Sequence, residues 1–336
     1  MARSAGNPKG RRKPVKKPGV LESTRPVVDG AEHVQIDRSR VQALCREWAQ
    51  NPVPIPPWDD SVHFSEGSPA TANYVLLLDA LNFSFWPDPG QPRWTIDYKG
   101  RTLGGYMALA ASLKRGVEEG VPLLDADWLA RVTPEQLLHV FRGEGRIPML
   151  ERRVENAREA GQVLKSRYGG SFARAIESCQ GSAVQLVELL ERDFSSFRDV
   201  STWKGRMVRI LKRAQITAVD LYGTFGGTGL GNFSDLEELT AFADYKIPQV
   251  LRALGVLEYS PSLAGRVDRM ELLEPGSLEE VEIRAAMVWA TEWIRQGLQA
   301  EGLNRRAFEL DWFLWNMGQA PLPEQKPYHR TRTWFY

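Results

Sequence analysis

The helical spacing of apolar residues is the feature that most constrains the fold of this 336-residue chain. From residue 104 onward, apolar side chains recur with the period of an amphipathic α-helix. The segment "RWTIDYKGRTL" alternates instead and carries a Lys-Gly turn, which predicts a small β-hairpin over 93–103. We therefore expect a mainly α protein with helices over 71–81, 105–118, 125–131, 134–141, 148–168, 172–178, 182–193, 203–221, 234–243, 248–254, 277–299 and 303–317.

Charge divides the chain into a tail and a body. Residues 1–18 hold seven Lys or Arg and no acidic residue, which leaves 36 basic against 42 acidic residues in the rest. A basic stretch rich in Pro and Gly cannot bury a core, so we expect a disordered tail over 1–30. Two interpretations of this tail are open. It contacts RNA or another polyanion, or it only makes the protein more soluble. We expect residues 31–336 to form a single compact helical domain.

Several classes of protein do not fit the composition. No apolar run approaches the roughly 18 residues of a membrane span and no signal peptide is apparent, so we expect a cytoplasmic protein without membrane contact. The two cysteines, Cys45 and Cys179, are interpreted as buried thiols. The four histidines lie far apart, so we expect no metal and no other cofactor. The acidic body argues against a stable nucleic-acid complex, because Lys and Arg dominate the affinity of such complexes.

The glycine-rich stretch "GTFGGTGLGNFSD", residues 223–235, raises the question of a phosphate-binding loop. It lacks the lysine that a P-loop requires after its glycines, which makes that interpretation weak. Alternatively, the glycines deliver Phe233 and Asp235 to a site of another kind. A core position for Phe233 and a helix-start position for Asp235 are the structural alternatives. Residues 234–254 predict a helix, a turn at 246–248 and a second helix, which is a helix–hairpin–helix pattern.

Asp311 occupies an unusual position in the predicted helix "NRRAFELDWFLWNMG". Its neighbours one turn away are all apolar, namely Ala307, Phe308, Leu314 and Trp315. A carboxylate in an apolar stripe is costly unless it is paired or used. The structural alternatives are a buried salt bridge to an arginine and a rotation of the stripe that brings Asp311 to its edge, and a tuned catalytic carboxylate is the functional one.

Cleavage of a glycosidic bond is a natural task for such a carboxylate without a metal, because it can stabilise an oxocarbenium-like carbon. Phe233 and Trp315 are then candidates to stack on a flat leaving group, and Asp235 is a candidate to bind its edge. Lys212 or Arg330 could hold a phosphate. A solvated helix face is the structural alternative for Lys212.

At these residues the chain resembles a known family, the queuosine salvage proteins, which are queuosine 5′-phosphate N-glycosylases. The similar stretches follow one another in consistent order from about residue 40 to the end of the chain, and "NFSFWP" with "FADYKIPQVL" is the most specific combination. They are "LDALNFSFWP", "YKGRTLGGYMALAA", "YGGSF", "FRDV" with "KRAQI", "LTAFADYKIPQVLRALGVL", "VEIRA", "LDWFLW" and "PYHRTRTWFY".

The resemblance implies hydrolysis of queuosine 5′-monophosphate to queuine, a 7-deazaguanine base, and ribose 5-phosphate. It also implies a helical fold similar to helix–hairpin–helix DNA glycosylases. Asp311 corresponds to the expected catalytic aspartate, with Asp244 as the rival for that role. By the same resemblance, Phe233 stacks on the base and Asp235 forms a hydrogen bond with it. His63 corresponds to a residue that contacts the base. Lys212 and Asp244 correspond to residues that contact the phosphate or the sugar. The long basic tail departs from the family pattern, as do Phe313 and Trp315 beside Asp311.

Two other functions stay open at this point. One is a DNA or tRNA glycosylase, or a nucleic-acid-binding protein, that uses the helix–hairpin–helix pattern. The other is a protein that binds queuosine without catalysis. The mechanism that we predict is dissociative, with Asp311 stabilising the ribosyl cation or attacking C1′ while a hydrogen bond or a proton helps the base to leave. The sequence does not indicate an oligomeric state.

Overall fold

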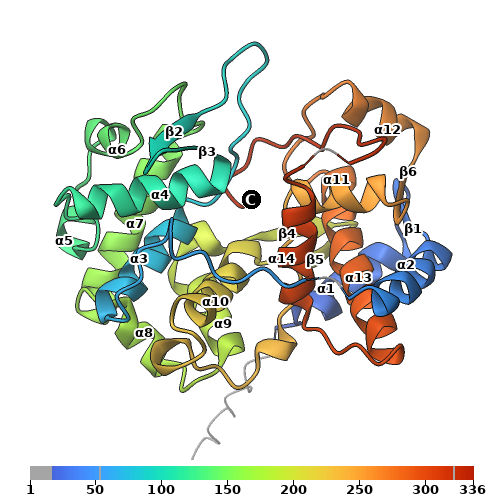
Figure 1. Cartoon of the computed structure of the whole chain (residues 1–336), viewed down its shortest axis with the longest axis horizontal. Helices are drawn as coiled ribbons and strands as arrows, with labels where there is room; N and C mark the ends of the chain where they lie inside the picture. The colour runs from blue at the N-terminus through green and yellow to red at the C-terminus, as the bar shows by residue number, and fades with distance from the viewer. Residues whose placement is uncertain (1–16, 53, 321) are drawn as a thin grey trace, which may run out of the picture.

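The computed structural model describes residues 17–52, 54–320 and 322–336, and it is mainly helical (Figure 1). The described residues form fourteen α-helices: α1 Val20–Asp29, α2 Arg38–Gln50, α3 Pro69–Ala80, α4 Gly105–Glu118, α5 Ala126–Leu129, α6 Pro134–Val140, α7 Leu150–Tyr168, α8 Phe172–Ser178, α9 Ala183–Asp193, α10 Lys212–Thr224, α11 Lys246–Ala253, α12 Pro261–Asp268, α13 Leu278–Ala300 and α14 Ala307–Met317. The predicted fold class, mainly α, is confirmed.

The strands form three small antiparallel pairs. β2 Thr95–Tyr98 pairs with β3 Arg101–Gly104, which confirms the predicted hairpin, and β4 Val200–Trp203 pairs with β5 Arg206–Arg209. Both hairpins turn on a Lys-Gly dipeptide with positive φ at both residues, the backbone that two-residue hairpin turns require. β1 Val34–Ile36 pairs with β6 Leu257–Tyr259, far along the chain.

Three sequence-based predictions are wrong in part. The helix expected over 203–221 begins only at Lys212, because the Lys204-Gly205 turn closes the second hairpin before it. The tail expected over 1–30 includes helix α1, which packs on α13; residues 1–16 lie outside the described part of the chain. Apolar residues Val20, Val27 and Val28 of α1 contribute to a hydrophobic core, which explains why this segment is ordered.

The helix expected over 234–243 is also absent, so the helix–hairpin–helix pattern does not form. Only the short 3-10 helix Leu236–Glu238 is present, and the chain then runs without regular structure to α11. Side chains from other helices bind backbone N–H groups of this segment: Gln215 Oε1 accepts from Thr240 at 2.8 Å and Asp311 Oδ1 accepts from Phe242 at 2.7 Å. These tertiary contacts replace the hydrogen bonds of a helix.

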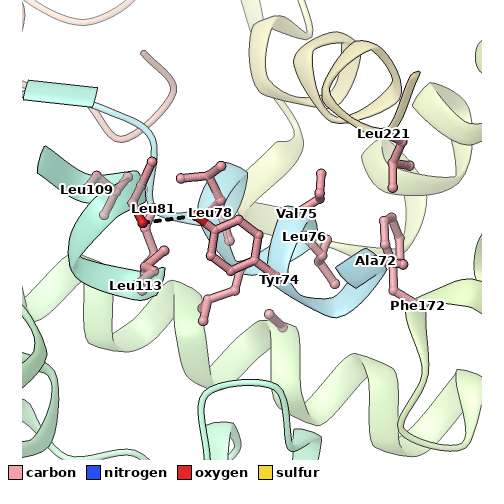
Figure 2. Close-up of a cluster of buried hydrophobic side chains, with 14 of the residues drawn as sticks. Ala72, Tyr74, Val75, Leu76, Leu78, Leu81, Leu109, Leu113, Phe172 and Leu221 are labelled. Carbon is pink, nitrogen blue, oxygen red and sulfur yellow. Dashed lines mark hydrogen bonds between the residues drawn. The ribbon is translucent and has the colours of Figure 1, made fainter. Parts of the chain in front are cut away.

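Two hydrophobic cores organise the molecule. The first core contains buried residues from α3–α10, and the second contains those from α1, α2 and α11–α14. Helix α3 lies deep in the first core with residues 71–80 all buried, and Figure 2 shows it between Leu109 and Leu113 on one side and Phe172 and Leu221 on the other. A helix that is apolar on every side suits such a central position.

Helix α14 joins the two cores. Its Phe308 packs in the first core, whereas Leu310 and Leu314 pack in the second. In Figure 1, α3–α10 occupy the left half and α11–α14 the right half, with the C-terminus between them. Among the helices of residues 17–52, 54–320 and 322–336, none is both long and apolar enough to cross a membrane.

Candidate active site

A cavity of about 760 Å³ lies where the two cores meet. This volume is within the range of pockets that hold small molecules. Two helices supply residues at intervals of four, which places them on one face of each helix. Lys212, Ile216 and Asp220 come from α10, and Asp311, Trp315 and Gln319 come from α14 and its end. The lining also includes residues from segment 56–63, the loop after α3, residues 93–95, the start of α4, segment 242–246 and the C-terminal residues.

A buried arginine supports the site from behind. Arg284 of α13 binds both oxygens of Asp199, at 2.6 and 2.9 Å, and donates to the carbonyl oxygen of Ala243 at 3.1 Å. Asp199 Oδ2 in turn accepts the backbone N–H of Lys212 at 3.1 Å. The Arg284 guanidinium therefore fixes Lys212, the first residue of α10, and Ala243, the residue before Asp244. This sets the distance between the side chains of Lys212 and Asp244.

Asp244 lies at the start of α11 and points its carboxylate into the cavity lining. Its Oδ1 accepts the backbone N–H groups of Lys246 and Ile247, both at 2.9 Å, as a helix-capping carboxylate does. Burial raises the pKa of Asp244, and the ammonium of Lys212 is the strongest influence that lowers it. The two backbone donors and the nearby cation all favour the ionised form.

Asp311 is buried as the sequence indicated, with 5% of its surface exposed. Its Oδ1 accepts from Phe242, and no arginine in the described part of the chain forms a salt bridge with it. Burial raises the pKa of Asp311 well above its usual range, and the negative charge of Asp244 raises it further. The two carboxylates therefore differ in environment: Asp244 holds its charge more easily, whereas Asp311 retains a proton more easily.

Lys212 is the cation between these carboxylates. It is 6% exposed, and burial lowers its pKa while the charges of Asp244 and Asp311 raise it. Within residues 17–52, 54–320 and 322–336 its ammonium group forms no hydrogen bond or ion pair. A buried ammonium that faces a cavity in this way is available to a bound anion or to charge that develops during a reaction.

Aromatic rings form another wall of the cavity. Trp58 and His63 stack with their ring centroids 4.2 Å apart, and Tyr106 meets Trp315 edge to face at 6.1 Å. Trp312 also lines the cavity, 6.4 Å from Trp58. Such rings suit a flat ligand, because stacking and edge-to-face contacts between rings are favourable.

A second group of polar residues lies on this wall. His63 Nδ1 is 2.7 Å from the carbonyl oxygen of Asp59, and His63 Nε2 is 2.9 Å from the hydroxyl of Tyr106. The Tyr106 hydroxyl is also 3.1 Å from Asp220 Oδ2. Burial lowers the pKa of His63 to about 4 and raises the pKa of Asp220 to about 7.

Two further cations line the cavity near Asp244. Lys246 is half-buried, and the positive charge of Arg93 contributes to lowering its pKa, after burial as the main cause. The Lys246 ammonium lies 5.6 Å from the centroid of the Tyr328 ring, which also lines the cavity. Two like charges that lie close together are relieved by an anion between them.

The cavity brings together five of the eight residues that the sequence singled out: Asp311, Asp244, Lys212, His63 and Trp315. Arg330 does not line it, because its guanidinium lies against the sulfur of Met270 at 3.3 Å and near the rings of Trp86 and Tyr328.

The remaining two residues, Phe233 and Asp235, lie outside the cavity. Phe233 packs in the first core. Asp235 binds the start of α9, where its oxygens accept from the backbone of Ala183 at 2.6 Å and from the hydroxyl of Ser182 at 2.5 Å. The glycines before them form a turn after α10, with positive φ at Gly226, Gly227 and Gly229. Phe233 thus has the core position that was its structural alternative, whereas Asp235 binds the start of α9 and not of the helix predicted over 234–243.

Sequence reasoning missed several residues of the cavity, chiefly Asp220, Tyr106, Trp58, Lys246 and Arg93. One signal could have found Asp220, since it lies two helical turns after Lys212 on the same face of α10. The others come from loops or helix starts that no periodicity connects. In the ranges that the structure describes, no three His, Cys, Asp or Glu side chains gather as metal ligands do.

Fold and cavity together define a helical protein whose cavity suits a small, flat, anionic ligand beside buried carboxylates. Residues 62–336 match the family model described as queuosine salvage protein. A protein of Sphaerobacter thermophilus, named queuosine 5′-phosphate N-glycosylase/hydrolase, is 50% identical over 95% of this chain and 98% of its own length. A protein of the same name from Dictyostelium discoideum is 36% identical over 94% of this chain and 98% of its own length. Another from Nematostella vectensis is 36% identical over 83% of this chain and 85% of its own length. The chain belongs to the queuosine salvage protein family.

Proposed function

We propose that this protein hydrolyses the N-glycosidic bond of queuosine 5′-monophosphate and releases queuine and ribose 5-phosphate. The observation that carries the proposal is the pair of buried carboxylates, Asp244 and Asp311, which face Lys212 inside an aromatic cavity of nucleotide size. The names of the relatives agree with this chemistry. Release of the base would return it for salvage into tRNA.

Asp244 is the carboxylate that we assign to the ribosyl carbon. Its Oδ1 is held by two backbone N–H groups, and no hydrogen bond from the described residues engages its Oδ2. Positive charge develops at C1′ as the glycosidic bond breaks, so an ionised carboxylate there stabilises the transition state. Asp311 was the first choice from the sequence. Its surroundings favour the protonated form, so we assign it to positioning Phe242 and to hydrogen bonding rather than to the charged role.

The two ends of the nucleotide would then bind to different walls. The base would lie among Trp58, His63 and Trp315, where the aromatic rings gather. The phosphate would lie near Lys246 and Arg93, which together supply two positive charges beside the sugar site. The charges of Asp244 and Asp311 act on Lys212, so we assign Lys212 to the sugar and to Asp244.

Asn substitutions at the two carboxylates test this assignment. We expect Asp244→Asn to bind queuosine 5′-monophosphate but to release queuine at least about 100-fold more slowly, because a charged group that stabilises the transition state is lost. Asp311→Asn should have the smaller effect, since an amide resembles a protonated carboxyl group. Chromatography of the reaction mixture, which separates queuine from the nucleotide, measures both rates. The opposite order of effects would make Asp311 the reacting carboxylate.

The wild-type reaction is the test of the function itself. A binding protein without catalysis would retain the nucleotide and release no queuine under the same conditions. A DNA or tRNA glycosylase would instead bind a duplex or a tRNA with steep salt dependence, which the acidic body does not favour. We further infer a cytoplasmic location, on the sequence features given above, and, from the family alone, a relation to the helix–hairpin–helix glycosylases. Cell fractionation and superposition on such an enzyme would test these two points.

A further inference from the structure

We infer that Asp220 is a neutral carboxylic acid in the resting protein and that it donates its proton to the departing heterocycle. Tyr106 and His63 hold it in that state as positioning residues. The inference rests on the proposed function, because it names the source of the proton that the leaving base takes up. Asp220 lines the cavity from α10, on the wall where the aromatic rings gather.

The hydrogen bonds in this chain determine where the protons lie. The carbonyl oxygen of Asp59 can only accept, so His63 Nδ1 must carry a hydrogen. His63 is 2% exposed and stays neutral, which leaves Nε2 as an acceptor for the Tyr106 hydroxyl at 2.9 Å. The single proton of Tyr106 is then used. For the 3.1 Å contact between Tyr106 and Asp220 to be a hydrogen bond as well, Asp220 must be the donor.

The same number of protons permits one other arrangement. The extra proton could lie on His63, with Tyr106 donating to an ionised Asp220. That arrangement buries two opposite charges separated by a tyrosine, whereas the first buries none. The directions of the pKa shifts agree with the arrangement that buries no charge, because the pKa of Asp220 is raised and the pKa of His63 is lowered. Burial is the main cause of both shifts.

Charged and titratable groups surround Asp220 from every helix that packs against it. Asp79 lies behind it in α3, where burial and the charge of Asp220 raise the pKa of Asp79 well above its usual range, so the two carboxyl groups do not both ionise at low cost. Three neighbours favour the ionised form of Asp220 and lower its pKa, namely the hydroxyl of Tyr106 first, then the charge of Lys212 two turns earlier in α10, and then Asp79. The others that interact with it are Tyr74 of α3, Tyr106 of α4 and Asp311 of α14.

The chemistry of the leaving group calls for such a donor. A 7-deazaguanine has carbon where a purine has N7, so the ring nitrogen on which protonation would assist departure is missing. When the bond from C1′ to the base nitrogen breaks, its electron pair stays on the heterocycle. The proton of Asp220 passes to a basic atom of the heterocycle and leaves a carboxylate. Water supplies hydroxide to C1′ and one proton to the site, so the sum is hydrolysis.

Asp220→Asn separates this role from a structural one. The amide resembles the neutral acid and can donate to Tyr106, so the fold should be retained. We expect it to slow queuine release at least about 100-fold, as loss of a general acid does. It should release p-nitrophenolate from p-nitrophenyl ribose 5-phosphate at the wild-type rate, because that leaving group needs no proton. Asp97→Asn, in the exposed hairpin outside the cavity, is the matched control.

Two further readouts complete the test. In the wild type, the rate of queuine release should fall as pH rises through the pKa of Asp220, because the acid form is required. Asp220→Asn should not show this fall in rate. Tyr106→Phe should show it at a different pH. Infrared difference spectra of wild type minus Asp220→Asn at neutral pH should show the carbonyl band of a protonated carboxyl group, whether or not the protein is active. An absent band, an unchanged rate of queuine release, or an equal loss on both substrates would overturn the inference. Absence of queuine release by the wild type would instead overturn the proposed function.

Discussion

At the scale of single residues, burial of ionisable groups is the feature that distinguishes this protein. Its cavity holds Asp220, Asp244, Asp311 and Lys212, each at most 8% exposed. The interior stabilises an ion poorly, so each group depends on its neighbours for its protonation state. The cation Lys212 acts on both carboxylates, but Asp244 has two backbone donors, whereas Asp311 has one donor and the like charge of Asp244 as the second cause that raises its pKa. The residue type alone does not reveal this difference.

His329 gives a prediction at this scale that concerns stability. It is 1% exposed, and burial together with the charge of Arg284 lowers its pKa to about 3. The folded protein therefore binds fewer protons at this position than the unfolded chain between about pH 6.5 and pH 3, and stability is lost as pH falls through this window. We expect the free energy of unfolding to fall by up to about 1.4 kcal/mol per pH unit from this residue.

Urea unfolding of wild type and His329→Gln, measured at a series of pH values below about 6.5, would check this prediction. The variant should show the shallower loss of stability on acidification. Parallel curves for the two proteins would contradict it. The comparison must be a difference between the two proteins, because His63 is also held neutral and acts in the same direction.

At the scale of elements, tertiary contacts override local sequence at two places near the site. The Lys204-Gly205 turn joins two strands in a segment where the apolar spacing predicts a helix. Asp311 and Gln215 bind backbone N–H groups of segment 239–245, which therefore does not form a helix. Asp244 lies at the end of this segment. The departure from helical structure is thus the reason that a carboxylate can cap α11 and line the cavity at the same time.

Asp235 supports the start of α9, and its replacement tests the base-binding role that the sequence suggested. We expect Asp235→Ala to lower the free energy of unfolding by about 1 kcal/mol, because it removes the acceptor for Ala183 and Ser182, while kcat is unchanged. Urea unfolding and the queuine-release assay measure the two quantities. Glu237→Ala, at an exposed neighbouring position, is the control. A variant of normal stability that no longer releases queuine would restore the base-binding assignment.

At the scale of the whole molecule, the cavity exists because two cores meet around α14. Residues far apart in sequence, from His63 to Tyr336, reach it only through this arrangement. The buried pair Arg284–Asp199 connects α13 to the segment before β4. A ligand in a cavity between the two cores contacts residues of both. Binding of the ligand should therefore stabilise both cores.

We therefore expect queuosine 5′-monophosphate to stabilise the entire protein in one cooperative transition. With the slow variant Asp244→Asn, a ligand concentration of about 100 times Kd should raise the free energy of unfolding by about 2.7 kcal/mol. Thermal unfolding with and without the ligand would measure this, and guanosine 5′-monophosphate is the comparison for base specificity. Two separate transitions, of which only one responds to the ligand, would contradict the expectation.

The amino-acid sequence by itself determined the helical class, the first hairpin, and the bounds of α4 and α8, because these depend on spacing within one segment. It also indicated five residues of the cavity, on the motifs shared with the family. Tertiary structure alone decided that Phe233 and Asp235 lie elsewhere, that 234–243 is not a helix, and that Asp220, Tyr106 and His63 form one hydrogen-bonded chain. The physical reason is that a carboxylate's partners, and hence its charge, come from helices distant in sequence, and local periodicity carries no information about them.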